Sequence, residues 1–586
     1  MINGKVIVAQ HEERFKRIKN YDTWPGEAIK SCLRIAKIQP EKIDAVVWAG
    51  NSSLVPHYFL TNRYSNFSYK DMVTEQNKYW YPTLYENKKI NYLNIFKNKI
   101  NIKQAPGKKI LNILKKNFNN KKGQEIMRDL RYILVEQELG IKKEKVFFIE
   151  HHECHAFYSL ANTYKKNTNK KYLIFTLDGS GDKGINATVS VFYKNKLNRI
   201  FSSKEFILGR IYRHITLILG MKWGEHEYKT MGLAPYSSES YSNGPYKIFK
   251  KSLSIYNFNK IKKNIKDCYF SFLKPLSYFR FDGIAQGLQK FTEEIIVKWF
   301  SLWINKKKIY NICYSGGVSM NVKANLEISK INKMNSLNIM GAGTDDSLSI
   351  GACYAFSIKN NQKVYPIKDL YLGYEISELE ITNIIKKISK KKFTIIKNPN
   401  NKLIANLLNV GLILGRCKGK MEFGARALGN RSIIANPSSQ DTIRKINQKI
   451  KSRDFWMPFA PSVLEEEAKN YFKIIKNTDY TQMSVCVEAK ENINSVIPAV
   501  LHPSDFTARI HLVKKEINND YYDLIKNFKQ ISGIGLILNT SLNLHGKPIA
   551  RNANDCLEIL NKSDIDGIQI ENFLFIKKNN NKNYLL

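Results

Sequence analysis

Three apolar segments that each run into a glycine-rich turn constrain the fold more than any other feature of the chain. They are YLIFTL at 172–177, YNICYS at 310–315 and SLNIM at 336–340, and the turns that follow contain DGSGD, GG and GAGTDD. The first segment returns as an alternating strand, as in a β-hairpin, whereas the other two precede helical stretches. Strands and helices that alternate, with glycine turns at strand ends, predict an α/β fold whose ligands lie at those turns.

Two further regions flank these segments. Residues 1 to about 170 mix apolar strand runs, KVIVAQ, DAVVWAG and KVFFIE, with helical stretches. Residues 60–125 break that pattern with Tyr, Asn and Lys, which indicates an insertion, either a lid near a site entrance or a plain surface excursion. A linker is plausible at 363–375, and a second α/β region follows it. We expect two domains, 1–365 and 366–586, the first subdivided near residue 171.

The net charge of the chain indicates which classes of partner it binds. Of 586 residues, 93 are Lys or Arg and 51 are Asp or Glu, a formal net charge of +42. The lysines are spread through every segment, which indicates solvated faces and attraction of small anionic substrates rather than a nucleic-acid partner. The apolar runs are too short for a membrane span, and we expect no signal peptide. Eight scattered cysteines without a CxxC pair fit a reduced cytoplasm.

A group of histidines forms the first candidate site. In IEHHECHAF a strand meets a helix, which places His151 and His155 on one helix face. Asp345 follows another strand and would complete a 2-His-1-carboxylate set, which suits Fe(II), with Zn or Mn as alternatives. Without other evidence, two histidines at this spacing more often belong to a packed or solvated helix face than to a metal site. Asp345 is equally well explained as a helix N-cap.

The glycine turns form the second candidate site. Backbone N–H groups of the DGSGD and SGGV turns could approach phosphate groups, and Asp178 could hold a phosphate-bound metal ion. A plain hairpin turn explains DGSGD equally well. The candidate nucleotide-binding residues in the two turns are Asp178, Gly179, Gly181, Ser315, Gly316 and Gly317.

A basic loop in the second region forms the third candidate site. The run KGKMEFGARALGNRS carries Lys420, Arg426 and Arg431 between glycines, and arginine forks grip carboxylate or phosphate with paired hydrogen bonds. Its phenylalanine, leucine and glycines favour a packed loop over an exposed one. Downstream, HPSDFTAR and NTSLN add hydrogen-bonding groups that turn chemistry alone also explains.

These blocks occur in an order that resembles the O-carbamoyltransferases of nodulation-factor, cephem and aminoglycoside biosynthesis. The matching blocks are HHECHA (151–156), DGSGD (178–182), EYKTMGLAPY (227–236), SGGVSMNVKAN (315–325), TDDSLSIGA (344–352), GKMEFGARALGNRS (419–432), MPFAPS (457–462), HPSDFTAR (502–509) and NTSLNLHGKPI (539–549). FGARALGNRS and EYKTMGLAPY are highly specific, and the resemblance spans nearly the whole chain.

The resemblance implies an architecture and a two-stage chemistry. The N-terminal domain would be similar to the actin-like ATPase fold of the tRNA threonylcarbamoyl-transfer enzymes, and the C-terminal domain would be YrdC-like. Carbamoyl phosphate would be cleaved to carbamate in the C-terminal domain. Carbamate and ATP, bound with Mg, would then give carbamoyl-adenylate and pyrophosphate in the N-terminal domain, and a substrate hydroxyl would take the carbamoyl group.

The resemblance also implies roles for individual residues. The metal would be held by His151, His155 and Asp345, with Lys229 screening phosphate charge and Asn321 near the ribose or base. Carbamoyl phosphate would be bound by Lys420, Arg426, Arg431, His502, Arg509 and Asn539.

The chain departs from the family pattern at four places. Lys420 replaces an arginine of the GRxEFGPRALG block, and Met457 replaces the arginine before PFAP. Lys547 replaces the glutamate of GEPI. The N-terminus begins at what reads as the second strand of the family, about twenty residues in. We expect either a start codon assigned too far downstream or a degraded copy in which adenylation is impaired.

The resemblance leaves other functions open. A tRNA threonylcarbamoylation enzyme shares both domain types, but the FGARALGNRS block argues against it. A hydrogenase-maturation carbamoyltransferase would carry CxxC pairs, and none is present. An inactive binding protein would fit the short N-terminus and the Lys420 and Met457 changes. The expected partners are small molecules and a hydroxyl-bearing acceptor, with a homodimer as a further expectation.

Overall fold

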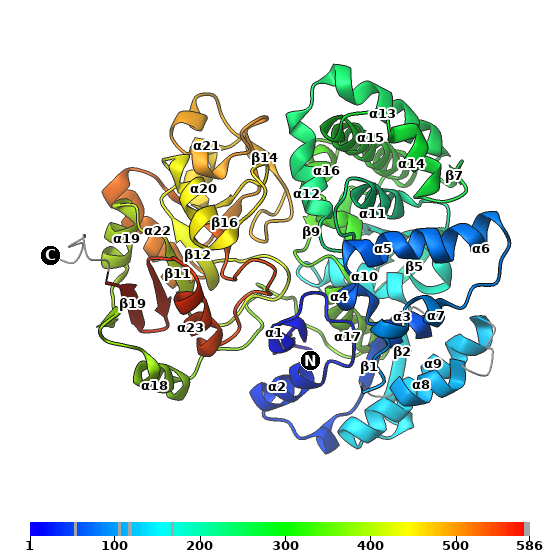
Figure 1. The fold of residues 1–586 in the computed structure, drawn as a ribbon, viewed down its shortest axis with the longest axis horizontal. Helices are drawn as coiled ribbons and strands as arrows, with labels where there is room; N and C mark the ends of the chain where they lie inside the picture. The colour runs from blue at the N-terminus through cyan, green and yellow to red at the C-terminus, as the bar shows by residue number, and fades with distance from the viewer. Residues whose placement is uncertain (52–54, 104–106, 115–119, 166–168, 579–586) are drawn as a thin grey trace. The chain divides into compact units, whose positions relative to one another are not determined.

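A computed structural model of the chain describes residues 1–51, 55–103, 107–114, 120–165 and 169–578. Its contacts divide the chain into two compact units. Unit 1 contains Met1–Ile7 and Ile18–Pro366, and unit 2 contains Val8–Arg17 and Ile367–Leu586. Figure 1 traces the chain through both units, and each unit combines sheets with helices, so the mixed α/β class predicted from the sequence is confirmed.

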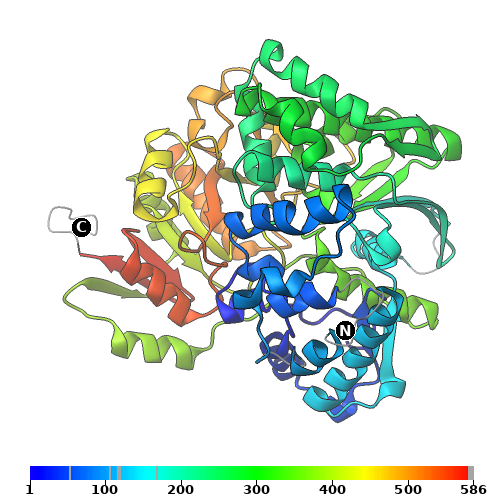
Figure 2. The same ribbon diagram turned by 45° about the vertical axis from the view of Figure 1, so that its right-hand side comes forward.

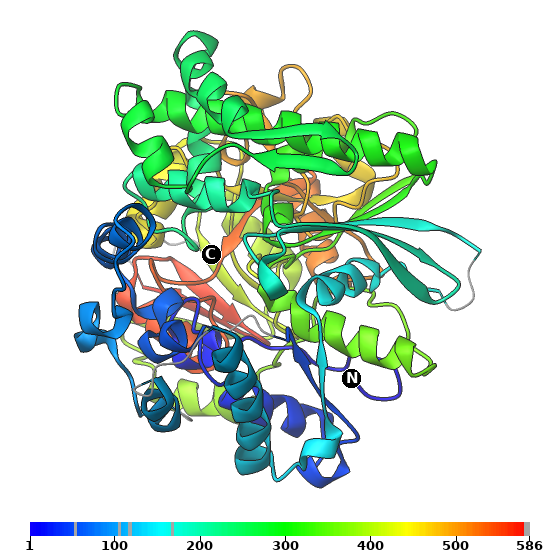
Figure 3. The same ribbon diagram turned by 90° about the vertical axis from the view of Figure 1, so that its right-hand side faces the viewer.

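A five-stranded sheet forms the centre of unit 1. Its strands, in spatial order, are β5 (Lys196–Ser203), β4 (Ala187–Tyr193), β3 (Tyr172–Leu177), β8 (Asn311–Ser315) and β9 (Ser336–Ile339). The pair β3–β4 is antiparallel, as the hairpin pattern predicts, whereas β3, β8 and β9 run parallel to one another. Figure 3 shows β3, β4 and β5 side by side in cyan to teal. Because β3 is buried at every position, it reads as a continuous apolar run.

Helices cover this sheet. The ring of Phe300 on α15 (Phe281–Lys307) stacks on Phe175 of β3 with 3.8 Å between ring centroids. Along α15 lies α13 (Glu239–Ser252), in green in Figures 1 and 2. The other helices and strands near them are α11 (Leu208–Ile218), α12 (Glu227–Leu233), β6 (Leu253–Asn257), β7 (Lys260–Lys263), α14 (Phe270–Leu276) and α16 (Val322–Ser329).

A second, smaller sheet pairs β1 (Val46–Ala49) with β2 (Val146–Ile149) in parallel. Two helices, α10 (His151–Leu160) and α17 (Leu348–Lys359), pack against each other. The helix α17 also contacts β1 and β2, whereas α10 also contacts β3 and β8 of the larger sheet. Helix α10 therefore runs buried between sheet elements, and nine of its ten residues are buried.

The N-terminal run KVIVAQ is not a strand, and the sequence prediction for it is wrong. Among the described residues, the one ladder contact nearby is an isolated bridge between Ile2 and Lys5, and β1 pairs with β2 alone. Apolar alternation predicts a strand only where a neighbouring strand lies beside it to accept the backbone hydrogen bonds. Instead, residues 8–17, which include α1 (Glu13–Lys16), belong to unit 2.

The region predicted as an insertion, 60–125, is helical where it is described. Its elements are α3 (Pro56–Thr61), α4 (Arg63–Asn66), α5 (Tyr69–Glu75), a π-helical turn (Gln76–Trp80), α6 (Tyr81–Tyr85), α7 (Tyr92–Ile95), α8 (Gly107–Leu114) and α9 (Asn120–Leu139), with α2 (Gly26–Ala36) upstream. Phe67, Met72 and Phe96 share one buried cluster with Leu217 and Trp223, so this region packs on the body of unit 1.

A buried ion pair anchors these helices. Arg63 donates to both carboxylate oxygens of Glu75 at 2.6–3.0 Å, and Glu75 is fully buried. We expect Glu75→Ala to lower the free energy of unfolding by about 3–5 kcal/mol, because it leaves a buried guanidinium without its counter-ion. Glu86→Ala, which removes the exposed pair with Lys88, should cost less than about 1 kcal/mol. Urea denaturation measures both, and equal losses would contradict the assignment.

Unit 2 is built on an eight-stranded mixed sheet. In spatial order its strands are β10 (Phe393–Lys397), β19 (Phe573–Lys577), β18 (Gly567–Ile570), β11 (Leu414–Cys417), β12 (Arg431–Ala435), β17 (Leu536–Ser541), β13 (Ala460–Leu464) and β16 (His511–Val513). Its helices are α18 (Glu378–Lys387), α19 (Asn401–Asn409), α20 (Asp441–Ile446), α21 (Ala468–Tyr471), α22 (Asn519–Ser532) and α23 (Ala553–Lys562), and β14 (Val487–Glu488) pairs with β15 (Thr507–Ala508). Among the described residues of either unit, no helix has the length and apolar content to cross a bilayer.

Candidate functional site

Three turns meet at one edge of the unit 1 sheet. Asp178 follows β3, the Gly316–Gly317 pair follows β8, and Asp345 lies in the turn after β9. Because these strands are parallel, their carboxyl ends lie at the same edge. Helix α10 starts there as well: the Asp182 carboxylate accepts the backbone N–H of His151 at 2.9 Å, next to the helix N-terminus.

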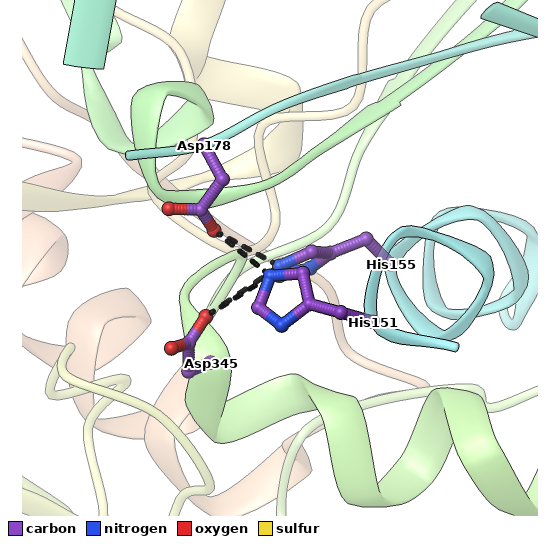
Figure 4. A group of neighbouring side chains, drawn as sticks. All are labelled: His151, His155, Asp178 and Asp345. Atoms are coloured by element: carbon purple, nitrogen blue, oxygen red, sulfur yellow. Dashed lines mark hydrogen bonds and ion pairs between the residues drawn. The ribbon is translucent and has the colours of Figure 1, made fainter. Parts of the chain in front are cut away.

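Four side chains converge at this edge (Figure 4). The ligand atoms of His151, His155, Asp178 and Asp345 all lie within 4.8 Å of one another. From Asp178 Oδ2 the distances are 3.0 Å to His155 Nε2 and 3.6 Å to His151 Nε2. From Asp345 Oδ1 they are 3.6 Å to His155 Nε2 and 3.7 Å to His151 Nε2.

This group of four fits a metal ion. Protein ligands bind such ions at about 2.0–2.2 Å, so two ligand atoms on one ion lie about 3–4.3 Å apart. The distances between the imidazoles and the carboxylates, 3.0–3.7 Å, fall in that range. His151 is 2% exposed, and its Nε2 has no hydrogen-bond partner among the described residues. Two imidazoles and two carboxylates are a donor set suited to Fe(II), Mn or Zn.

The charges of the group of four support one another. Burial alone would lower the pKa of His151, but the carboxylates of Asp345 and Asp178 outweigh it and raise the pKa to about 9. Burial alone would raise the pKa of Asp178, but the two imidazoles hold it well below its usual range. Asp178 is therefore ionised at neutral pH, as cation binding requires, whereas His151 is protonated there and would release its proton when a cation binds.

The neighbouring His152 takes no part in the group. Its Nδ1 lies 2.8 Å from Thr176 Oγ1 and its Nε2 lies 2.9 Å from the Ile185 carbonyl oxygen. Burial first, then the charge of His151, lowers the pKa of His152 to about 4. His152 is therefore a neutral packing residue that fixes α10 on the hairpin. The next residue, Glu153, also lies outside the group of four, and its side chain forms an ion pair with Lys359 at 2.7 Å.

The glycine turns pack directly on the group of four. Gly316 has a φ of 106°, and a Cβ there would lie 2.3 Å from the Leu177 carbonyl oxygen. Gly317 N–H donates to Asp178 Oδ2 at 3.2 Å, and Ser315 Oγ lies 3.4 Å from His155 Nδ1. Among the described residues, the backbone and hydroxyl groups of SGG thus hold two side chains of the group of four, Asp178 and His155.

The remaining residues proposed for nucleotide binding lie in three settings. Asn321 caps α16 by accepting from Ala324 N–H at 3.0 Å and pairs with the Gln289 amide. Gly181 lies against the rings of His151 and His152. Lys229 lies near His226. Burial first, then the charge of Lys229, lowers the pKa of His226 to about 4.

One cation beside the DGSGD turn was missed by the sequence analysis. Arg213 Nη2 lies 3.1 Å from the position that a Cβ of Gly179 would occupy. Its guanidinium also lies 4.9 Å from the Trp223 ring. No carboxylate forms an ion pair with Arg213 in the part of the chain that the structure describes. The motif blocks do not contain this arginine, so only the packing of α11 on the turn reveals it.

In unit 2, three arginines form what we call the arginine triad: Arg426, Arg453 and Arg509. Burial, then the charges of Arg426 and Arg453, lower the pKa of Arg509 well below its usual range. The Arg453 guanidinium donates to Thr540 Oγ1 at 3.0 Å. Within the described ranges no carboxylate pairs with Arg509. Clustered guanidiniums with one lacking a counter-ion are an arrangement that binds a small dianion.

Arg453 is a second residue that sequence reasoning missed. It lies four residues before Met457, the position where the family pattern has an arginine. Arg453 therefore gives the triad a cation from the same loop as Met457.

Four of the residues proposed for carbamoyl phosphate, Lys420, Arg431, His502 and Asn539, lie outside the triad. Lys420 is exposed. Arg431 is fully buried, and its guanidinium donates to the carbonyl oxygens of Gly419, Asn430 and Tyr374 at 2.9–3.1 Å. His502 is 3% exposed, and its Nδ1 accepts from Ser504 N–H at 3.2 Å.

Asn539 ends a chain of hydrogen bonds. Its Nδ2 donates to the Ala427 carbonyl oxygen at 3.0 Å and to Ser462 Oγ at 2.9 Å. Ser462 Oγ lies 3.0 Å from His511 Nδ1, within hydrogen-bond distance of that imidazole. Asn539 Oδ1 is buried and has no partner among the described residues, so it remains available to a ligand N–H group.

The Asn539–Ser462–His511 contacts, which we call the relay, predict that the free energy of unfolding falls in acid. His511 is 3% exposed, and burial lowers its pKa from 6.5 to about 3. Between pH 6.5 and about 3, His511 is protonated in the unfolded chain but neutral in the folded one. The contribution of neutral His511 to the free energy of unfolding is therefore complete above pH 6.5 and falls as the pH drops toward 3. We expect a loss of up to about 1.4 kcal/mol per pH unit below that point. Urea denaturation of wild type and His511→Asn at pH 7.5 and 5.0 measures it: the variant should show the flatter dependence, and equal slopes would contradict the relay.

Both parts of the chain match models of one family. Residues 1–354 match the carbamoyltransferase N-terminus and residues 405–577 match the carbamoyltransferase C-terminus. The chain therefore belongs to the carbamoyltransferase family and is a carbamoyltransferase enzyme, as the motif resemblance implies.

Two relatives are similar to this chain over most of its length. The uncharacterised protein MJ1058 of Methanocaldococcus jannaschii is 32% identical over 80% of this chain and 79% of its own length. Nodulation protein NolNO of Sinorhizobium fredii is 26% identical over 98% of this chain and 78% of its own length. A solved structure of full-length HypF in the phosphate- and nucleotide-bound form covers 32% of this chain and 22% of that one, at 19% identity and a TM-score of 0.22.

Proposed function

We propose that this carbamoyltransferase is an ATP-dependent O-carbamoyltransferase that acts on a hydroxyl of a sugar, a polysaccharide precursor or a secondary metabolite. Unit 1 would have the actin-like ATPase fold and unit 2 the YrdC-like fold. The order of the parallel strands β3, β8 and β9, with ligand groups in the turns after each, supports the first assignment.

In unit 2, carbamoyl phosphate would react with water to give carbamate, phosphate and a proton. The arginine triad would bind the phosphoryl oxygens, and no change of charge on the protein is needed. The carbamoyl NH₂ group would donate to Asn539 Oδ1, the buried acceptor without a partner among the described residues. Binding would offset the repulsion among the three guanidiniums, which favours the dianion over a neutral ligand.

In unit 1, carbamate would attack the α-phosphorus of ATP, giving carbamoyl-adenylate and pyrophosphate. The acceptor hydroxyl would then attack the carbamoyl carbon, lose its proton and release AMP. His151, His155, Asp178 and Asp345 would hold the metal, Fe(II) with Zn or Mn as alternatives, which when bound polarises phosphate or carbonyl oxygens and neutralises developing charge. Arg213 would bind a phosphate of the nucleotide at the DGSGD turn.

The observation that carries the proposal is the group of four at the carboxyl ends of three parallel strands. Its ligand atoms lie within 4.8 Å of one another and directly contact the SGG turn. Such a site would combine a metal centre with Arg213, the cation beside the DGSGD turn that would bind phosphate. A carbamoyltransferase that activates its donor with ATP needs both in one place.

The test is a screen of hydroxyl acceptors. The enzyme is incubated with carbamoyl phosphate, ATP-Mg and pools of sugars, nucleotide sugars and aminoglycosides, and the products are examined by mass spectrometry. We expect a mass increase of one carbamoyl group that needs both carbamoyl phosphate and ATP. ATP turnover that depends on added tRNA would favour the tRNA-modifying alternative instead.

A further inference from the structure

The N-terminal segment 8–17 is part of the domain that holds the arginine triad. The chain enters unit 2 at Val8 and leaves it at Arg17. Ala9 N–H donates to the Leu372 carbonyl oxygen at 2.9 Å. Arg17 Nη1 donates to the Ile549 carbonyl oxygen at 2.8 Å and lies 3.5 Å from Asp555. The segment is thus fixed at both ends within the unit.

Between these ends, two side chains hold the loop that carries Arg426. The guanidinium of Arg14, 1% exposed, donates to the carbonyl oxygens of Glu422 at 2.7 Å and Gly424 at 2.6 Å. The imidazole of His11 stacks on Phe423 with 4.5 Å between centroids, and its Nε2 accepts from Gly424 N–H at 2.9 Å. Arg14 and His11 therefore hold three consecutive residues of the loop.

The opposite end of the loop is fixed by Glu422. Its Oε1 accepts backbone N–H groups from Leu428 at 2.8 Å, Asn430 at 2.8 Å and Arg431 at 3.0 Å. Arg426 lies between the two anchored stretches, 424 and 428, and its charge acts on Arg509. The position of its guanidinium depends on the backbone conformation at Gly424, which has a φ of 102°.

We propose that Arg14 and His11 are positioning residues for Arg426, and so for the phosphate end of carbamoyl phosphate. This inference rests on the proposed function. In this proposal neither side chain contacts the substrate directly. They act through the backbone at 422–424, where both side chains bond directly to the stretch that leads into Arg426. A guanidinium displaced by about 1 Å can cost 10²-fold in rate.

The experiment separates the two stages of the reaction. One assay follows phosphate release from carbamoyl phosphate. The other follows pyrophosphate release from ATP when carbamate is supplied directly as freshly dissolved ammonium carbamate, which bypasses the arginine triad. For Arg14→Ala we expect kcat/KM for carbamoyl phosphate to fall by about 10- to 100-fold, mainly through KM, while the carbamate-driven reaction keeps its wild-type rate.

Two further variants complete the test. Lys16 lies in the same helix, is exposed and, among the described residues, forms an ion pair with Glu12 at 3.6 Å, so Lys16→Ala should match wild type in both assays. His11→Ala should repeat the Arg14→Ala pattern more weakly, and it serves if Arg14→Ala does not fold. Equal losses in both assays, or no loss in either, would overturn the inference. A wild-type enzyme that uses carbamate but never cleaves carbamoyl phosphate would instead overturn the first stage of the proposed function.

Discussion

His155→Ala is expected to abolish bound metal and carbamoyl transfer together. His155 Nε2 lies 3.0 Å from Asp178 and 3.6 Å from Asp345, so its removal opens the group of four at the centre. A metal ion contributes several kcal/mol of charge stabilisation in a transition state, so we expect the rate to fall by about 10³-fold or more. Metal content by inductively coupled plasma mass spectrometry and carbamate-driven pyrophosphate release measure the two effects.

The matched control is Glu153→Gln on the same helix. Glu153 pairs with Lys359 at 2.7 Å and lies outside the group of four, so this variant should keep its metal and its rate. Full metal occupancy in His155→Ala would contradict the assignment, whatever its activity. Asp178→Asn, which removes the ligand charge and keeps the shape, should likewise lose metal.

Arg509→Gln is expected to lose function and gain stability. Removing one guanidinium of the arginine triad should raise KM for carbamoyl phosphate by about 10- to 100-fold, since a hydrogen bond between charged groups contributes about 1.5–3 kcal/mol. The same change removes a buried charge and its repulsion from Arg426 and Arg453; burial first, then that repulsion, lowers the pKa of Arg509. We therefore expect the melting temperature of the ligand-free protein to rise by roughly 2–4 °C.

Saturating inorganic phosphate provides the control for this pair of effects. It should raise the melting temperature of wild type more than that of Arg509→Gln, because only the intact triad binds the anion well. A variant with unchanged KM, or one that melts earlier than wild type without ligand, would show that Arg509 is a structural residue instead.

Much of the fold could be predicted from local sequence patterns. The strands at 172–177, 311–315 and 336–339 are short apolar runs that end in glycine turns, and each is a strand of the unit 1 sheet. Their parallel alignment brings Asp345 to the two histidines of α10, as the motif order suggested. Asp178 was instead predicted to bind nucleotide, because the sequence does not show on which side of the DGSGD turn α10 packs.

Long-range contacts account for what the sequence could not show. KVIVAQHEERF has the local pattern of a strand followed by a helix, but Arg14 binds carbonyl groups 408 and 410 residues away. Arg431 lies in a motif with Arg426, yet its position in β12 buries it among backbone carbonyls while Arg426 lies in the loop before that strand. Sequence spacing cannot separate a ligand-binding arginine from one that hydrogen bonds its own backbone.

The central claim is that carbamoyl phosphate and ATP are consumed in one coupled sequence. The most direct measurement is the stoichiometry of AMP, pyrophosphate and phosphate formed from both substrates with an accepted hydroxyl compound present. The account predicts one AMP, one pyrophosphate and one phosphate per carbamoylated product, and no AMP when carbamoyl phosphate and carbamate are both left out. Formation of ADP in place of AMP, or carbamoylated product without ATP, would contradict it.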